Sequence, residues 1–214
     1  VDYKKLTDVS SIVQMTEALH HRGPDSSSNS FYRASDYHVA LGHKRLSILD
    51  LSVKGSQPMI YKHLEIVYNG EVYNFNEIKT DLIKLGYKFN SKTDTEVIIK
   101  AFHKWGIHFV NRLNGMFSIS IYDKKADTIY AFRDRAGVKP FYWYYDNRVF
   151  LFSSELKSFH KNPLFIKKIK KSSLESFFKY GYISAPYTIF QNTYKLRAGH
   201  YIEFNLKSKK ITEK

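Results

Sequence analysis

The spacing of apolar residues changes at Gly115, and this change constrains the fold more than any other feature of the sequence. Before Gly115, apolar residues recur at three-to-four spacing in several segments, which predicts amphipathic helices. These segments are residues 10–21, 75–85 and 93–105. After Gly115 apolar and polar residues alternate, which predicts a meander of antiparallel strands. These are residues 117–122, 128–132, 141–145 and 148–152.

Shorter segments complete the predicted order of elements. Residues 37–41 and 45–49 are predicted as paired strands around Gly42 and His43, and residues 64–68 as another strand. The serines after Asp25 predict a loop. Helices and strands that segregate along the chain indicate an α+β fold with helices covering the sheets. We predict one domain over residues 1–161, and a linker and bridge to a further domain over residues 162–214.

Composition excludes several classes of protein. Hydrophobic residues make up 43% of the chain, which is enough for a folded core, and no apolar run approaches the roughly 18 residues of a membrane span. The chain has no cysteine, so these residues hold no disulfide, thiolate metal site or cysteine nucleophile; this composition suits the cytoplasm. The net charge of +14 leaves nucleic-acid binding as an alternative, but without a recognition motif we favour a solvated, lysine-rich surface.

Asn69 and Gly70 follow an apolar strand and allow two interpretations. Asn-Gly is a common hairpin turn. A strand ending in Asn-Gly also aims a side-chain amide and a bare backbone N–H at one point, which is what a carbonyl oxygen needs when it becomes negatively charged in acyl transfer. The second interpretation makes these two residues an oxyanion hole.

Three charged residues would suit a zwitterionic amino acid. Arg45 can hold an α-carboxylate with two parallel hydrogen bonds. Asp94, at the start of a predicted helix, and Glu71 can hold an α-ammonium, although Asp94 could equally complement the helix dipole. With Asn69 and Gly70 facing a side-chain carbonyl, the set matches glutamine. The histidines lack zinc-ligand spacing and are treated as structural, and no glycine-rich phosphate loop occurs.

The sequence closely resembles the N-terminal glutaminase domain of glutamine-hydrolysing asparagine synthetases, which are class II glutamine amidotransferases. The resemblance covers nearly the whole chain. It rests on His21-Arg22-Gly23-Pro24-Asp25, Gly42-His43-Lys44-Arg45-Leu46-Ser47-Ile48-Leu49-Asp50, Gln57-Pro58-Met59, Asn69-Gly70-Glu71-Val72-Tyr73-Asn74, Thr93-Asp94-Thr95-Glu96, Arg133-Asp134-Arg135-Ala136-Gly137-Val138-Lys139-Pro140 and Ser154-Glu155-Leu156-Lys157.

The resemblance implies the N-terminal-nucleophile (Ntn) hydrolase fold, a four-layer αββα sandwich of two antiparallel sheets. It also implies residue roles in glutamine hydrolysis. Asn69 and Gly70 would form the oxyanion hole, and glutamine would be bound by Arg45, Leu46, Ile48, Leu49, Glu71 and Asp94. The turn from His21 to Asp25 would pack beside the nucleophile.

The nucleophile of the resembled family is a cysteine at the mature N-terminus, and this chain begins with Val1. We favour a fragment of a longer enzyme over a protein that has lost its nucleophile, as β-lactam synthetases have. In the longer enzyme, a C-terminal synthetase domain would use ATP and Mg to amidate aspartate. A relative with another acceptor, such as a sugar carboxylate, a non-catalytic homologue and a homodimer stay open. No cofactor or metal is expected in this domain.

Overall fold

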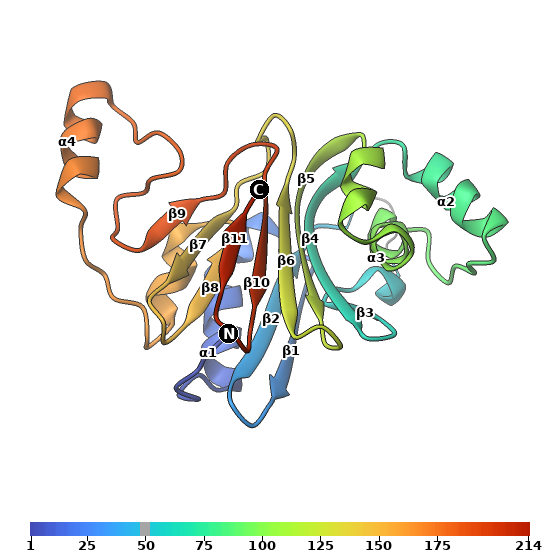
Figure 1. Ribbon diagram of the computed structural model, residues 1–214, viewed down its shortest axis with the longest axis horizontal. Helices are drawn as coiled ribbons and strands as arrows, with labels where there is room; N and C mark the ends of the chain where they lie inside the picture. The colour runs from blue at the N-terminus through green and yellow to red at the C-terminus, as the bar shows by residue number, and fades with distance from the viewer. Residues whose placement is uncertain (48–51) are drawn as a thin grey trace.

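The computed structural model describes residues 1–47 and 52–214 and places two β-layers between helices (Figure 1). The helices are α1 (Val9–Glu17), α2 (Phe75–Lys84), α3 (Asp94–Trp105) and α4 (Lys171–Tyr180), with short 3-10 helices η1 (His20–Arg22), η2 (Val53–Gly55), η3 (Gly106–Arg112) and η4 (Leu156–Lys161). The strands are β1 (Ser26–Arg33), β2 (His38–Arg45), β3 (Met59–Tyr61), β4 (Leu64–Val72), β5 (Gly115–Asp123), β6 (Thr128–Arg133), β7 (Tyr142–Tyr145), β8 (Phe150–Ser153), β9 (Thr193–Lys195), β10 (Tyr201–Asn205) and β11 (Ile211–Glu213).

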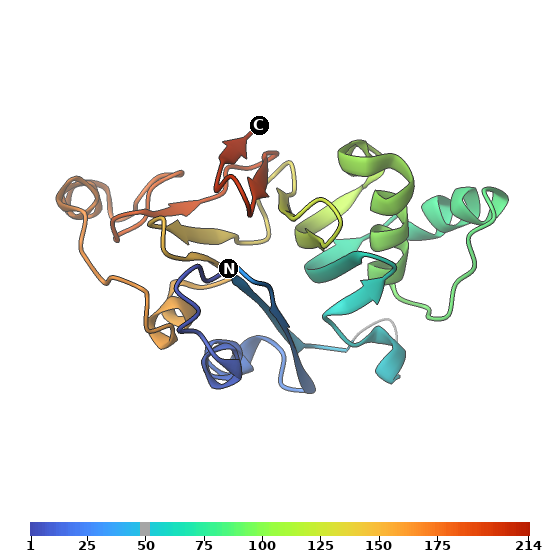
Figure 2. The same cartoon turned by 60° about the horizontal axis from the view of Figure 1, so that its bottom comes forward.

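All of these strands pair antiparallel. One layer is a six-stranded sheet in the order β11-β10-β6-β5-β4-β3. The other layer consists of two pieces, the pair β1-β2 and the three strands β8-β7-β9. Helix α1 packs outside β1 and β2, and α3 packs on the outer face of β3 and β4 with α2 beside it (Figure 2). The predicted α+β sandwich of antiparallel sheets is therefore confirmed.

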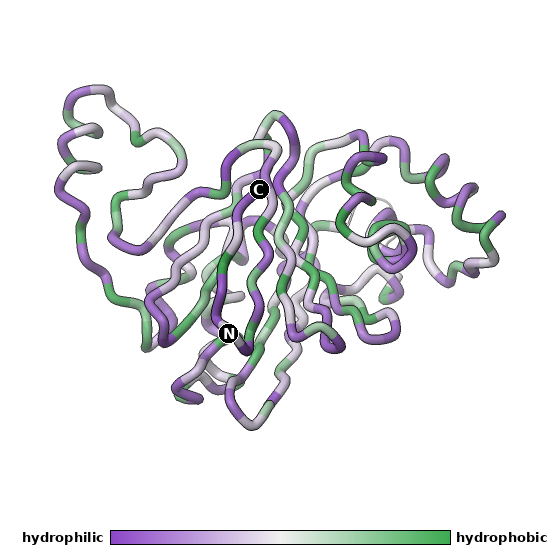
Figure 3. Tube along the Cα trace, viewed as in Figure 1, coloured by the Kyte–Doolittle hydropathy of each residue, from purple (hydrophilic) through white to green (hydrophobic). Residues whose placement is uncertain are grey.

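Apolar side chains cover both faces of the six-stranded sheet. Leu64 and Ile66 of β4 belong to the cluster under α2 and α3, whereas Val67 belongs to the cluster between the two β-layers. This follows from the period-two alternation of a strand, whose successive side chains point to opposite faces. Figure 3 shows apolar and polar residues interspersed along the central strands, with polar residues at the outer turns.

The second β-layer differs from the prediction. The serine-rich segment predicted as a loop is strand β1, and β2 runs unbroken through Gly42 and His43, where we predicted a turn between two strands. The serines of β1 are exposed, so this strand lacks the apolar alternation on which the prediction depended. Gly42 is needed inside β2, because a Cβ there would lie 2.0 Å from Thr16 Oγ1 of α1.

Helix α3 begins at the predicted cap. Thr93 Oγ1 accepts a hydrogen bond from Glu96 N at 3.3 Å. A capping box would return the Glu96 carboxylate to the Thr93 amide. Instead the carboxylate accepts from Asn90 N and Ser91 N, and Thr93 N donates to Ser91 Oγ. In place of a capping box, these hydrogen bonds connect the Glu96 side chain to the loop before α3 and hold that loop in position.

Residues beyond 162 pair with both layers. Strand β9 pairs with β7, and β10 joins β11 to the edge of the six-stranded sheet at β6. The division of the chain at residue 162 stays a prediction about domain organisation. Among the described helices, none combines the length and apolar character needed to cross a membrane.

Candidate active site

Asn69, Gly70 and Glu71 lie inside β4 rather than in a turn, so the hairpin interpretation is wrong. Opposite them on β5 are Ser118, Phe117 and Met116. The two strands approach so closely that a Cβ on Gly70 would lie 2.2 Å from the Met116 carbonyl oxygen. Only glycine fits this close approach.

The backbone N–H of Gly70 points away from β5. Phe117, its partner across the ladder, turns both backbone groups towards Asp134: its carbonyl accepts from Asp134 N at 2.9 Å, and its N–H donates to Asp134 Oδ2 at 3.2 Å. In an antiparallel pair such a residue faces a non-hydrogen-bonded partner, whose own N–H points to the opposite edge. At that edge β3 pairs with β4 only as far as Ile66.

Side chains bind the neighbouring amides along this open edge of β4. Tyr68 N donates to Gln57 Oε1 at 2.6 Å, and Val72 N donates to Asp94 Oδ2 at 3.2 Å. The Gly70 N–H between them finds no acceptor within residues 1–47 and 52–214. A donor left free between two bound neighbours is the arrangement that an oxyanion hole requires.

Asp94 approaches β4 from the first turn of α3. Its Oδ2 also accepts from the Tyr68 hydroxyl at 2.7 Å, and the residue is 6% exposed. Burial raises the pKa of Asp94, hydrogen bonds from the Tyr68 hydroxyl and the Val72 and Thr95 amides oppose that rise, and the negative charge of Glu71 adds to it. Glu71 and Asp94 are thus within electrostatic reach of each other, as a shared cationic ligand requires.

Arg45 ends β2 and is buried. Its Nη1 donates to the Ser52 carbonyl at 2.8 Å. A Cβ built on Gly55 would lie 2.1 Å from Arg45 Nη2 and 2.9 Å from Thr93 Cγ2, so the guanidinium lies next to the residue that caps α3. The structure therefore brings Arg45 to the same helix end as Asp94.

Two of the predicted wall residues lie outside the described chain. Ile48 and Leu49 fall in the segment that the structure does not describe. Leu46 follows Arg45 directly, and its side chain is 57% exposed.

Asn69 faces a cavity between the two β-layers. Together with its open mouth the cavity measures about 1150 Å³, and β2 and β8 line it from opposite sides. Asn69 Nδ2 lies 3.4 Å from Ser154 Oγ across this space. Arg22 also lines the cavity, and its Nη1 lies 3.0 Å from Glu155 Oε1. The turn that begins at His21 therefore borders the cavity that Asn69 faces.

His43 lines the same cavity, although the sequence analysis treated it as structural. Its Nε2 lies 3.1 Å from the Tyr68 carbonyl oxygen, to which the Nε2–H donates. Burial lowers the pKa of His43 to about 4, so the imidazole is neutral near pH 7. The hydrogen bond connects β2 to β4 at the level of the candidate site.

Sequence reasoning also missed Tyr68 and Gln57 as parts of the site. Tyr68 lies two residues before Gly70 and therefore on the face of β4 that meets α3. Gln57 was noted within a motif, but its bond to Tyr68 N depends on a contact between separate segments. No group of metal-ligating side chains occurs in the described ranges.

Comparisons with known proteins agree with this fold. The structure matches the glutamine phosphoribosylpyrophosphate amidotransferase from Bacillus subtilis with a TM-score of 0.69 at 15% identity, over 96% of this chain and 46% of the other. The fold is therefore that of an Ntn amidotransferase domain with antiparallel sheets.

The sequence then defines the family. A family model described as a glutamine amidotransferase domain matches residues 2–214. The chain is 43% identical, over 94% of its length, to the putative asparagine synthetase [glutamine-hydrolyzing] 2 of Methanocaldococcus jannaschii, and 35% identical, over 96%, to the asparagine synthetase [glutamine-hydrolyzing] 3 of Bacillus subtilis. It covers 42% and 34% of those two proteins. The chain belongs to the class II glutamine amidotransferases and resembles the N-terminal domains of asparagine synthetases.

Proposed function

We propose that this domain binds glutamine and, together with a cysteine nucleophile, releases its side-chain ammonia for the ATP-dependent amidation of aspartate. The open edge of β4 carries this proposal. There the Gly70 N–H is free between two amides that are already bound, one of them by Asp94. Arg45 lies at the same end of α3.

Each residue has a role set by its chemistry. Arg45 binds the α-carboxylate of glutamine as a charge-assisted fork. Asp94 and Glu71 bind the α-ammonium. Asn69 Nδ2 and Gly70 N–H donate to the amide oxygen when the tetrahedral intermediate gives it a negative charge. Leu46, Ile48 and Leu49 form the adjoining wall.

The nucleophile would enter along the cavity between β2 and β8. Asp2 bridges His38 on one side and Val149 on the other, antiparallel to both. In that register, a strand extended by about four residues beyond Val1 would place its first residue between His43 and Ser154, about two residues short of the level of Arg45. We propose that a cysteine outside these 214 residues occupies that position and attacks the glutamine amide carbon.

We also propose which molecule accepts the ammonia. Aspartate is supported by the similarity to two proteins named as glutamine-hydrolysing asparagine synthetases. ATP and Mg would bind in a separate synthetase domain, because the chain covers less than half of those relatives. Such an enzyme would work in the cytoplasm.

Isothermal titration of these 214 residues with L-glutamine tests the binding site. We expect saturable binding and no ammonia release, since the chain has no cysteine. Arg45→Gln should weaken binding by about tenfold or more, the value of a lost charge-assisted hydrogen bond. The matched control is Arg33→Gln, which changes an exposed arginine on β1. Absence of binding to the unmodified chain, or equal losses in both variants, would refute the site.

Asn69→Ala in the full-length enzyme tests the oxyanion role. Loss of one oxyanion donor should lower the rate of glutamine hydrolysis by about 10²–10³-fold, while glutamine binding changes little. The measurement is single-turnover ammonia release at saturating glutamine. An unchanged rate would remove Asn69 from the oxyanion hole.

A further inference from the structure

A second hollow lies on the outer side of α3, away from the cavity between the β-layers. We call it the lysine hollow. It measures about 1510 Å³ including its open mouth, and β3, the loop before α3 and one face of α3 line it. Its five cationic side chains are Lys54, Lys62, Lys88, Lys100 and Lys104.

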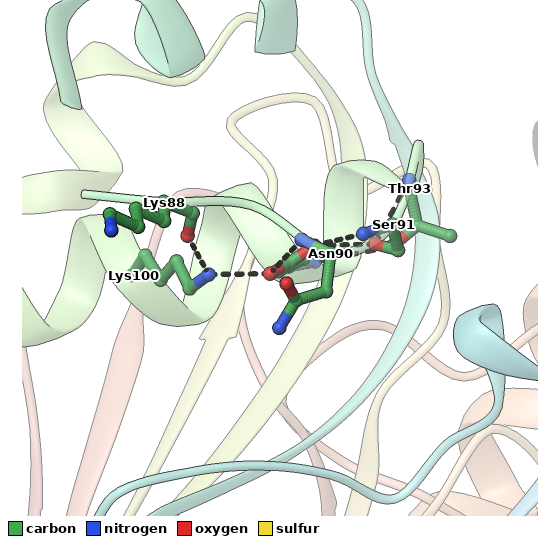
Figure 4. Close-up of polar contacts among 6 residues, drawn as sticks. Lys88, Asn90, Ser91, Thr93 and Lys100 are labelled. Carbon is green, nitrogen blue, oxygen red and sulfur yellow. Dashed lines mark hydrogen bonds and ion pairs between the residues drawn. The ribbon is translucent and has the colours of Figure 1, made fainter. Parts of the chain in front are cut away.

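Among the described residues that line this hollow, Glu96 is the one acidic residue, and its carboxylate is fully engaged. Figure 4 shows the contacts: the carboxylate accepts from Asn90 N at 3.0 Å, and from Ser91 N and Ser91 Oγ at 2.7 Å each, and it pairs with Lys100. Lys100 also donates to the Lys88 carbonyl. The charges of Glu96 and Lys100 cancel each other, so the other four lysines carry the net positive charge of the hollow.

Those four lysines have no acidic partner within residues 1–47 and 52–214. Among the described residues, none of Lys54, Lys62, Lys88 and Lys104 forms an ion pair with a carboxylate. By contrast, two cations that line the cavity between the layers are paired: Lys44 Nζ lies 2.6 Å from Glu17 Oε1, and Arg22 Nη1 lies 3.0 Å from Glu155 Oε1. Like charges gathered around one concave surface focus a positive potential into it.

The potential acts on a neighbouring group. His103 contacts a residue that lines the hollow: its Nδ1 lies 2.7 Å from the Tyr87 hydroxyl. Burial lowers the pKa of His103, and the positive charge of Lys62 lowers it further. His103 is therefore neutral near pH 7 and does not add to the charge.

The rim supplies apolar surface beside these cations. Ile60 and Leu85 line the hollow with side chains that are 60% and 50% exposed. The ammonium groups of Lys62 and Lys100 both lie near the Tyr61 ring, at 5.5 Å and 5.1 Å from its centroid. A ligand that suits this surface carries several negative charges at one end and an apolar or flat group at the other.

We propose that the lysine hollow is a binding site for a small organic di- or triphosphate, separate from the glutamine site. Its phosphates contact Lys54, Lys88 and Lys104, and its organic part lies against Ile60 and Leu85. Helix α3 is common to both sites, with Asp94 at the glutamine site and Lys104 at the hollow.

Titration with ADP tests the site. It is done at constant, physiological ionic strength, where charges on the protein surface act over only about 8 Å, so that distant lysines contribute little to binding. We expect saturable binding of ADP and none of adenosine. The double variant Lys88→Gln/Lys104→Gln should weaken ADP binding by about tenfold or more, as expected for lost charge-assisted contacts. The control Lys125→Gln/Lys168→Gln removes the same charge from exposed lysines elsewhere and should change it less than about twofold.

Three results would overturn the proposal: no saturable ADP binding to the unmodified chain, equal losses in the two double variants, or adenosine binding as tight as that of ADP. Glutamine binding is measured on the same samples. Because the two sites use different side chains, failure of the ADP site leaves the glutamine result unchanged, and the reverse also holds.

Discussion

Asp94 and Glu96 lie two residues apart in the first turn of α3, and both are 6% exposed, yet their pKa values move in opposite directions. Burial raises the pKa of both carboxyl groups. At Glu96, hydrogen bonds from Lys100, Ser91 and Asn90 outweigh burial and lower the pKa. At Asp94, hydrogen bonds from Tyr68, Val72 and Thr95 do not outweigh burial, and the pKa stays raised.

The difference separates a structural carboxylate from one prepared for a ligand. Glu96 has a cationic partner inside the protein and holds the loop before α3. Asp94 has neutral partners, among them the Tyr68 hydroxyl and the Val72 amide, and the negative charge of Glu71 acts on it as well. A cationic ligand beside Asp94 would supply a positive counter-charge, as Lys100 does for Glu96. Perturbed carboxylates of this kind concentrate at functional sites.

The largest expected effect is on stability at Glu96. Glu96→Gln leaves Lys100 buried without a counter-charge, so the free energy of unfolding should fall by about 3–5 kcal/mol. Urea unfolding at pH 7 measures this. The control is Asp81→Asn, which removes a carboxylate whose partners Lys84 and Arg112 are both exposed, and the loss of stability should be much smaller. Similar losses in both variants would contradict the structural role of Glu96.

The next effect is on glutamine binding at Asp94. Asp94→Asn keeps an acceptor for the Tyr68 hydroxyl but removes the charge that we propose binds the α-ammonium. Glutamine affinity should fall by about 10²-fold, which corresponds to about 2.7 kcal/mol. The free energy of unfolding should change by less than about 1 kcal/mol, since the variant stays hydrogen-bonded. A large loss of stability with unchanged affinity would reverse the assignment of the two carboxylates.

The smallest expected effect is that the contributions of Asp94 and Glu96 to stability depend on pH in opposite ways. The raised pKa of Asp94 makes its contribution to stability complete below its unfolded pKa, and that contribution is lost as pH rises through the folded value. The lowered pKa of Glu96 makes its contribution present above its unfolded pKa and lost as pH falls through the folded value. The stability advantage of Asp94→Asn over the unmodified chain should therefore shrink as pH is lowered from 7 towards the unfolded pKa of Asp94, near 3.8. A pH-independent difference in urea unfolding would contradict it.

Local patterns predicted much of the fold. The helices that begin near Phe75 and Thr93 and the strands after Gly115 were visible because apolar periodicity decides them. The serine-rich strand β1 was missed, because its partner β2 rather than its own residues makes it a strand. Single residues showed the same limit. The chemistry of Arg45, Asp94 and Asn69 suggested their roles, the family resemblance made those roles specific, and they stay predictions that the experiments above test.

The open edge of β4 could not be predicted from local patterns. It depends on where β3 stops, on the direction of the Phe117 backbone groups and on the reach of the Gln57 side chain. Those are contacts between segments far apart in sequence. Residues 69–71 reveal the donors that are available, but only the pairing around them decides which donor is free.

The division of the second β-layer has a consequence for how the domain could be assembled in the laboratory. Strands β2 and β8 each present an edge to the same cavity and belong to separate sheets in the described structure. A short synthetic peptide with a leading cysteine could therefore pair with both edges at once. These residues would then act as one half of a complementation system, in which recognition of the amino acid and the reactive thiol are supplied by different molecules.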